Sequence, residues 1–257
     1  MRIKAIVITM LIVAFLFCMQ KAAYAARPLS SEDAGVCGKG NFQLDAGFDY
    51  AKEGNKDKSY TFLLAGAYGI SQRSDLSVEL PYLMIAPGDG NNEARLSDIK
   101  LAFKSLIIPE GEINPAIALK IQLKLSNGNE EKNLGSGDED AGIIFAVSKT
   151  LGKLVLHGNL GYTLVGRGRD DTLKNYILYG LAGEYALSTK IKLVMELYGE
   201  SDSHFDPGSL RHHNLTPLIG FSYQLNEKIV LDTAFKVGIS ESRRQAYGLT
   251  MGCSVQF

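Results

Sequence analysis

The chain ends in AYGLTMGCSVQF (residues 246–257), which alternates between apolar and small polar side chains. Large or apolar residues fall at every second position from Tyr247 to Phe257, and glycine, hydroxyl and amide residues fall between them. An alternation with a period of two is typical of a β-strand with one apolar face. The end of the chain therefore predicts an amphipathic strand, whose apolar face must meet either a protein core or lipid.

The start of the chain predicts export. Arg2 and Lys4 precede an apolar run over residues 6–19, and residues 23–25 (AYA) have small side chains at the two outer positions, as a signal-peptidase site does. This arrangement is typical of a cleaved secretory signal. The apolar run, about 14 residues long, is short for a membrane-spanning helix. We therefore expect residues 1–25 to be a signal peptide.

Charge and composition exclude one class of partner and leave the fold open. The chain has 27 basic and 28 acidic residues, and three of the bases lie in the expected signal peptide, so the mature net charge is near −4. A slightly acidic chain has no basic footprint for nucleic acid. The 46% hydrophobic and 21% charged content fits a globular protein or a barrel, because alternating barrel strands give no hydropathy peak.

The alternation of the last strand recurs throughout the mature chain after a polar lead at residues 26–40. It predicts twelve strands, at residues 42–50, 60–70, 76–82, 99–107, 117–125, 143–147, 154–164, 177–187, 193–198, 215–225, 231–239 and 247–257. Short turns, such as residues 71–75 and 226–228, alternate with longer polar loops at residues 85–97, 127–140 and 200–213.

This organisation predicts an all-β protein: one antiparallel, up-and-down transmembrane β-barrel over residues 41–257, with residues 26–40 as a periplasmic lead. Strands of about ten residues suffice to cross a bilayer when tilted. Outer-membrane barrels have short periplasmic turns and longer outer loops, whereas an exported soluble sandwich has no reason to gather its long loops at one end. We therefore expect a protein of the outer membrane of a Gram-negative bacterium, in contact with outer-membrane lipid.

Two resemblances support this interpretation. The terminal strand, ending in Phe257, resembles the closing strand of bacterial outer-membrane barrels, which implies that this residue is read by the barrel-assembly machinery. An ordered set of motifs resembles the family called "MetA-pathway of phenol degradation": RPL (27–29), DAG (33–35), GKG (38–40), FQL (42–44), DLSVELPY (75–82), SDIKL (97–101) and LGSG (134–137). Cys37 and the absence of tryptophan depart from the family pattern. The resemblance implies an outer-membrane transporter for a small, often hydrophobic or aromatic, solute.

The alternation of side chains along each strand also predicts which charged side chains face the lumen of the barrel. The predicted lumen-lining residues are Lys100, Lys104, Lys120, Lys124, Asp45, Asp49, Glu79, Glu184, Lys192, Glu196, Asp232, Lys236 and His157. Four lysines share one hairpin, and most acids lie on other strands. One interpretation is an open pore with a basic and an acidic wall, which would tune ion selectivity. The other is a closed lumen filled by ion pairs, because buried charges must be paired, in a structural or loop-mediated binding barrel.

Enzymatic and metal-binding functions have weaker support. An outer-membrane lipid-modifying enzyme would need a serine beside a histidine, and no spacing places a serine with His157, the only strand histidine. The loop at residues 200–213 holds three histidines and two aspartates, His204, His212, His213, Asp202 and Asp206. Metal binding needs three or four converging ligands, and solvated loop side chains explain the group equally well. We therefore expect no catalytic residue, no metal site and no cofactor.

Cys37 and Cys253 are the cysteines that remain after signal removal. Two cysteines in an exported chain favour a disulfide, and barrel closure would bring both towards the periplasmic rim. However, Cys253 faces lipid by parity, and a bridge needs Cα atoms within about 7 Å. Two buried free thiols are the alternative.

Overall fold

The structure is a computed structural model that describes residues 27–52, 58–86, 92–132, 134–166, 174–201, 213–239 and 247–257. The expected signal peptide, residues 1–25, lies outside this part of the chain. The described residues form these strands and one short 3₁₀ turn: β1 (Phe42–Lys52), β2 (Lys58–Gly69), β3 (Ser74–Ala86), β4 (Glu93–Leu96), β5 (Lys100–Ile108), β6 (Ala116–Lys124), η1 (Glu130–Lys132), β7 (Asp140–Leu151), β8 (Leu154–Leu164), β9 (Tyr176–Ala186), β10 (Ile191–Ser201), β11 (His213–Gln224), β12 (Ile229–Lys236) and β13 (Tyr247–Gln256). No helix in this part of the chain is long and apolar enough to cross a membrane.

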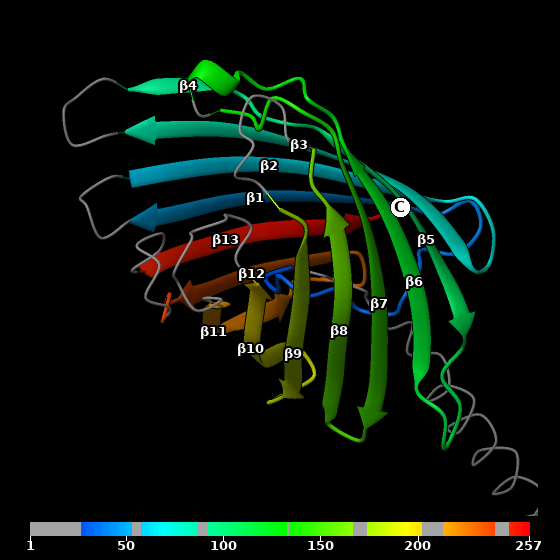
Figure 1. Cartoon of the computed structure of the whole chain (residues 1–257). Coiled ribbons are helices and arrows are strands. Elements are labelled where there is room, and N and C mark those ends of the chain that lie inside the picture. The colour runs from blue at the N-terminus through cyan, green and yellow to red at the C-terminus, as the bar shows by residue number, and fades with distance from the viewer. Residues whose placement is uncertain are drawn as a thin grey trace, which may run out of the picture.

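The strands close into one antiparallel barrel (Figure 1). Strands adjacent in sequence are paired, except β4 and β5, and β1 pairs with both β2 and β13, so the first and last strands form the seam. β4 and β5 share one place in the wall, because both pair with β3. The barrel wall therefore has twelve strand positions, and the prediction of a twelve-stranded barrel is confirmed.

The expected loop at residues 85–97 is wrong in part. β3 continues to Ala86, and β4 pairs back onto it in the register Tyr82↔Leu96. After the break at residues 97–99, the pairing of β5 with β3 has the register Glu79↔Lys100. Between the two registers β3 advances by three residues and the β4–β5 segment by four, so this segment holds one extra residue. Such a bulge interrupts the period-two pattern, which is why the alternation appeared to begin only at Ile99.

The apolar side chains face outwards and the polar side chains inwards. Large exposed residues such as Phe103, Leu160 and Leu181 lie on the outer face, with Leu181 69% exposed. Thr163 and Thr250, on the inner face, are almost completely buried. A soluble sandwich buries its apolar faces between its sheets, so this arrangement is that of a barrel in lipid.

The short connections and both ends of the barrel domain lie at one end of the barrel. β7 and β8 are joined by Gly152 and Lys153, and Gly152 has φ of 62°, a backbone conformation that favours glycine. At the same end, the Phe257 amide donates to the Phe42 carbonyl at 2.8 Å across the seam. That this end faces the periplasm stays a prediction.

Candidate functional site in the barrel lumen

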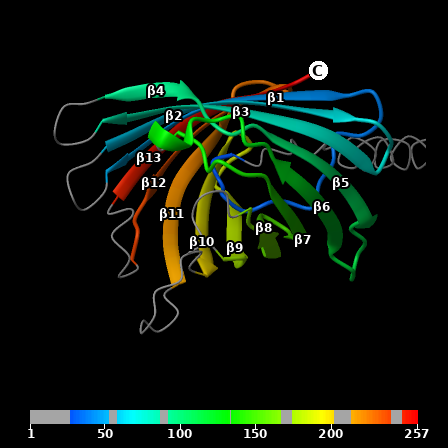
Figure 2. The same cartoon turned by 45° about the horizontal axis from the view of Figure 1, so that its top comes forward.

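Residues 27–36, named here the lumen segment, run through the inside of the barrel (Figure 2). The segment contacts inward-facing side chains of β1, β5, β6, β7, β8, β10, β12 and β13. The expectation that residues 26–40 form a periplasmic lead is wrong for the lumen segment. The segment supplies partners to several inward charges of the wall, such as Lys104 and Glu196.

Arg27 lies in an acidic pocket formed by the strands next to the seam. Its Nη2 atom donates to Thr250 Oγ1 at 2.7 Å and to the carbonyl of Met251 at 3.0 Å. Its Nε atom lies 3.5 Å from Asp232, and Nη1 lies 3.9 Å from Asp49. The guanidinium therefore neutralises acids of β1 and β12.

Two glycines make room for Arg27. Gly47 and Gly252 face each other in the register of β1 and β13. A Cβ atom built at either position would overlap the Arg27 side chain. The wall is therefore hollowed where the lumen segment begins.

Four backbone amides of the lumen segment donate to wall side chains rather than to a neighbouring strand. The amides of Ser30 and Ser31 donate to the two Glu196 oxygens at 2.9 and 2.6 Å. Asn159 accepts from the Glu32 amide at 2.5 Å and donates to the Glu32 carbonyl at 2.7 Å. The Ala34 amide donates to Ser148 Oγ at 2.9 Å. Because buried amides need such partners, these polar wall residues hold an extended chain in the lumen.

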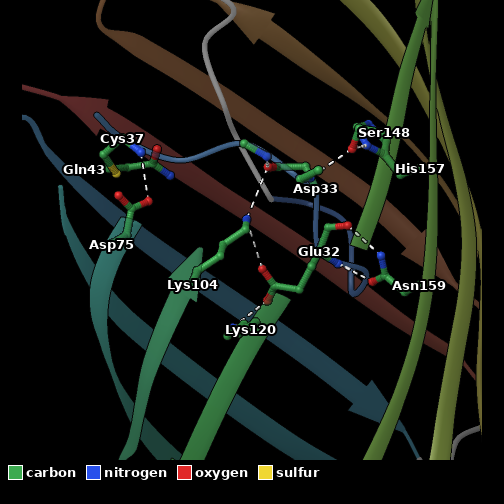
Figure 3. A network of polar contacts seen from close by, with 12 residues as sticks. Glu32, Asp33, Cys37, Gln43, Asp75, Lys104, Lys120, Ser148, His157 and Asn159 are labelled. Atoms are coloured by element: carbon green, nitrogen blue, oxygen red, sulfur yellow. Dashed lines mark hydrogen bonds and ion pairs between the residues drawn. The ribbon is translucent and has the colours of Figure 1, made fainter. Parts of the chain in front are cut away.

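The carboxylates of Glu32 and Asp33 meet the lysines of β5 and β6 (Figure 3). Lys120 Nζ lies 2.6 Å from Glu32 Oε1, and Lys104 Nζ lies 3.5 Å from Glu32 Oε2 and 3.3 Å from Asp33 Oδ1. Burial alone would raise the pKa of Glu32, but the two ammonium groups outweigh it and lower the pKa to about 2. Glu32 is therefore held as a carboxylate.

Cys37 follows the lumen segment on the inside of the wall. Its amide donates to Asp75 Oδ2 at 2.8 Å, and burial followed by the Asp75 charge raises the pKa of its thiol to about 12. Both Cys37 and Cys253 are free. Cys253 alternates with the buried Ser254 and pairs with the exposed Leu231, so it lies on the outer face. The disulfide interpretation is wrong because the barrel wall separates the two thiols.

All the lumen-lining residues predicted from parity have a polar partner in the structure. Besides the contacts above, the pairs are Lys100–Glu79 (3.7 Å), Lys120–Glu79 (3.8 Å), Lys124–Asp98 (3.8 Å), Lys124–Asp140 (2.5 Å), Lys192–Glu184 (2.7 Å), His157–Glu184 (3.4 Å), Lys236–Asp49 (2.6 Å) and Asp45–Gln43 (3.0 Å). The basic wall on β5 and β6 and the acidic wall at the seam are joined through the lumen segment. Their role in solute passage stays a prediction.

The expectation that no serine lies beside His157 is wrong. Ser148 lies directly opposite His157 in the register of β7 and β8, with Ser148 Oγ 2.8 Å from His157 Nδ1. Counting outwards from the short turn at residues 152–153 would have found this pair. Both side chains are buried in the lumen, and Ser148 Oγ also accepts the Ala34 amide. The loop histidines and aspartates at residues 202–212 lie outside the described residues, and the side chain of His213 is not described either.

The lowered pKa of Glu32 predicts how closure of the lumen depends on pH. A carboxyl whose pKa falls from 4.5 to about 2 on docking stabilises the docked segment fully above pH 4.5. This stabilisation is lost as the pH falls through about 2. If release of the segment opens a path for ions, the current of the wild-type protein in planar bilayers should stay low down to pH 4.5 and rise below it. Glu32→Gln should lack that component of the rise, and identical pH profiles would contradict the assignment.

Comparison with known proteins decides the family. The family model described as "Putative MetA-pathway of phenol degradation" matches residues 25–255. The chain belongs to this family. The match confirms the resemblance drawn from the motifs of the mature chain. A search of curated proteins finds no match.

Solved structures similar to this family member are outer-membrane barrels. The COG4313 outer membrane channel from Pseudomonas putida F1 has a TM-score of 0.75 at 15% identity, over 89% of this chain and 100% of that one. The NanC porin has a TM-score of 0.58 at 11% identity, over 83% of this chain and 98% of that one. The KdgM porin has a TM-score of 0.54 at 11% identity, over 84% of this chain and 99% of that one. At these identities the likeness establishes the outer-membrane barrel fold alone.

Proposed function

We propose that this protein is an outer-membrane channel for small solutes, closed at rest by its lumen segment. The observation that carries the proposal is the way residues 27–36 are held. They contact the wall through side chains and single amides, and they belong to no strand. The segment can therefore leave without breaking a strand pairing, and the twelve-place wall would then enclose an aqueous path.

The family and the similar structures support a channel of this kind. The family description refers to phenol degradation, and the similar structures are named as a channel and as porins. A small aromatic or otherwise hydrophobic compound is therefore the solute class we propose. An enzyme of the lipid-modifying kind is not proposed, because Ser148 and His157 face the covered lumen rather than the outer wall.

A closed structural barrel is the second candidate. It is favoured by the ion pairs of Glu32 and Asp33 with buried lysines, since breaking buried pairs is costly. In this alternative the lumen segment would be a permanent core, and the protein would act through its outer loops. The two candidates differ in whether the lumen ever conducts.

Conductance of the purified protein in planar bilayers tests the channel. We expect discrete openings whose ion selectivity depends on the lysine wall. Lys100 has a half-exposed side chain 3.7 Å from Glu79, and its charge can be reversed without removing a direct contact to the lumen segment. Lys100→Glu should shift the reversal potential towards cations, whereas Lys132→Glu, in an exposed pair with Glu93, should not. A protein that never conducts, even in variants that release the segment, would favour the closed barrel.

A further inference from the structure

We propose that Glu32 occupies the place of a solute carboxylate, and that small organic monocarboxylates with an apolar body open the channel by exchanging with it at Lys104 and Lys120. This inference rests on the proposed channel function and names its solute class. It starts from the two lysines, whose side chains are only 13% and 8% exposed.

The two lysines form a site for one carboxylate. Lys104 and Lys120 are direct partners in the β5–β6 register, and like charges directly opposite each other destabilise a sheet. The Glu32 carboxylate bridges them, with Oε1 towards Lys120 at 2.6 Å and Oε2 towards Lys104 at 3.5 Å (Figure 3). An anion with two oxygens is therefore what the pair requires.

The barrel wall supplies only more distant carboxylates, Glu79 near Lys120 and Asp75 opposite Lys104 in the β3–β5 register. Within the described part of the chain, the carboxylates within 4 Å of Lys104 both come from the lumen segment, Glu32 and Asp33. Lys120 has one wall partner, Glu79, at the longer distance of 3.8 Å. Release of the segment would leave two buried cations short of carboxylates, which is unfavourable unless another anion enters.

An apolar surface lies beside the two lysines. Leu106 follows Lys104 on the inward face of β5, and Ala116 and Ala118 precede Lys120 on that of β6. Ala34 of the lumen segment covers this patch, two residues after Glu32. The segment therefore presents a carboxylate with an apolar group beside it, and a solute that replaces it would carry the same two features.

Binding of the solute and release of the lumen segment are linked equilibria, so each favours the other. A solute that binds only when the segment has left stabilises the released state in proportion to its occupancy. Amides and ammonium groups can both form hydrogen bonds to water after release, but the two facing ammonium groups also repel each other, and an anion between them removes that repulsion. The solute carboxylate therefore opens the barrel that it enters.

Cys37 reports release of the segment. In the closed barrel its thiol is partly buried, with its pKa raised to about 12, so it should react slowly with an uncharged maleimide. The experiment uses the full mature chain carrying Cys253→Ser in detergent, with benzoate as the probe. Benzamide, its uncharged analogue, and sodium chloride at equal ionic strength are the controls. We expect benzoate to raise the labelling rate of Cys37 several-fold and saturably, and benzamide to leave it unchanged.

Substitutions test whether benzoate accelerates the labelling of Cys37 by binding at Lys104 and Lys120. Lys104→Gln and Lys120→Gln should lose the dependence of labelling on benzoate, whatever their basal rate. Lys132→Gln, which changes an exposed lysine outside the lumen, should keep it. Glu32→Gln should label faster without benzoate and respond at lower benzoate concentration, because the competing carboxylate is gone.

The outcomes separate this inference from the channel function. Equal acceleration by benzamide, or a benzoate response that persists in the Lys104→Gln/Lys120→Gln variant, would overturn the carboxylate site. So would a Glu32→Gln variant that labels and conducts readily but ignores benzoate, and this result would leave the channel intact. If neither Glu32→Gln nor any probe changes labelling or current, the carboxylate site and the channel both fail.

Discussion

Glu32→Lys is expected to drive the lumen segment out of the barrel and to raise the ionic current through it several-fold. The substitution replaces a carboxylate 2.6 Å from Lys120 and 3.5 Å from Lys104 with a third ammonium group. Breaking a buried ion pair costs about 3–5 kcal/mol, and about 1.4 kcal/mol is a tenfold change in an equilibrium. The ratio of docked to released segment should therefore fall by roughly a hundredfold or more. Planar-bilayer current and the labelling rate of Cys37 measure the change.

A reciprocal exchange shows whether the effect comes from this contact. Glu32→Lys combined with Lys120→Glu restores one ion pair at the same place, so current and labelling should return part of the way to wild type. Return is partial because the new glutamate lies near Glu79 and the new lysine near Lys104. Glu93→Lys is the matched control, because Glu93 pairs with Lys132 at 2.8 Å where both side chains are exposed. A Glu32→Lys current equal to that of wild type would show that the segment does not close the lumen.

The barrel could be predicted from the sequence because its strands are a local property. Alternation within about ten residues determines which side chains face lipid, and the short turns fix the order of pairing. The predicted strand at residues 247–257 is β13, Tyr247–Gln256. Prediction failed where the local rule was interrupted. The extra residue at the break of residues 97–99 reverses the alternation between β4 and β5, so the sequence pattern does not predict β4 as part of the strand that continues into β5.

The path of the lumen segment could not be predicted by the same rule. It has no period, and its contacts join residues far apart in sequence, such as Arg27 and Thr250. One signal was present in retrospect. Arg27 precedes Glu32 and Asp33 in the chain, and the inward faces offer acids at the seam and lysines on β5 and β6. Complementary charge could have indicated that the segment lies inside, but not which contacts it makes.

The pair of Ser148 and His157 is less predictable than the strands and more predictable than the path of the lumen segment. Alternation predicted an inward His157, but Ser148 lies one residue beyond the strand predicted at residues 143–147. The two side chains face each other across the hairpin of β7 and β8, so spacing along either strand alone does not predict the pair. Cross-strand partners are the closest side-chain neighbours in a sheet, so a predicted hairpin also predicts its pairs.

Deleting Phe257 is expected to remove most of the barrel from the outer membrane, although the chain is still exported and still able to refold when purified. In the structure the Phe257 side chain is 64% exposed, so it adds little packing to the finished wall. Its backbone closes the seam with Phe42 through hydrogen bonds of 2.8 and 3.3 Å. Loss of one terminal pair at the end of long ladders between β1, β13 and β12 should lower the stability of the folded barrel only slightly.

A large loss in cells together with a small loss in vitro would therefore separate recognition during assembly from stability. Phe42→Ala is the matched control, because the rings of Phe42 and Phe257 lie 6.1 Å apart and either change removes their contact. If the terminal residue is read by the assembly machinery, Phe257→Asp should reduce the heat-modifiable protein in outer-membrane fractions, whereas Phe42→Ala should leave it near wild type. Equal losses in the two variants would assign the effect to the ring contact at the seam. Normal amounts in both would mean that assembly of this barrel is directed by the rest of β13, whose outward Leu249 and Met251 continue the apolar face that Phe257 ends.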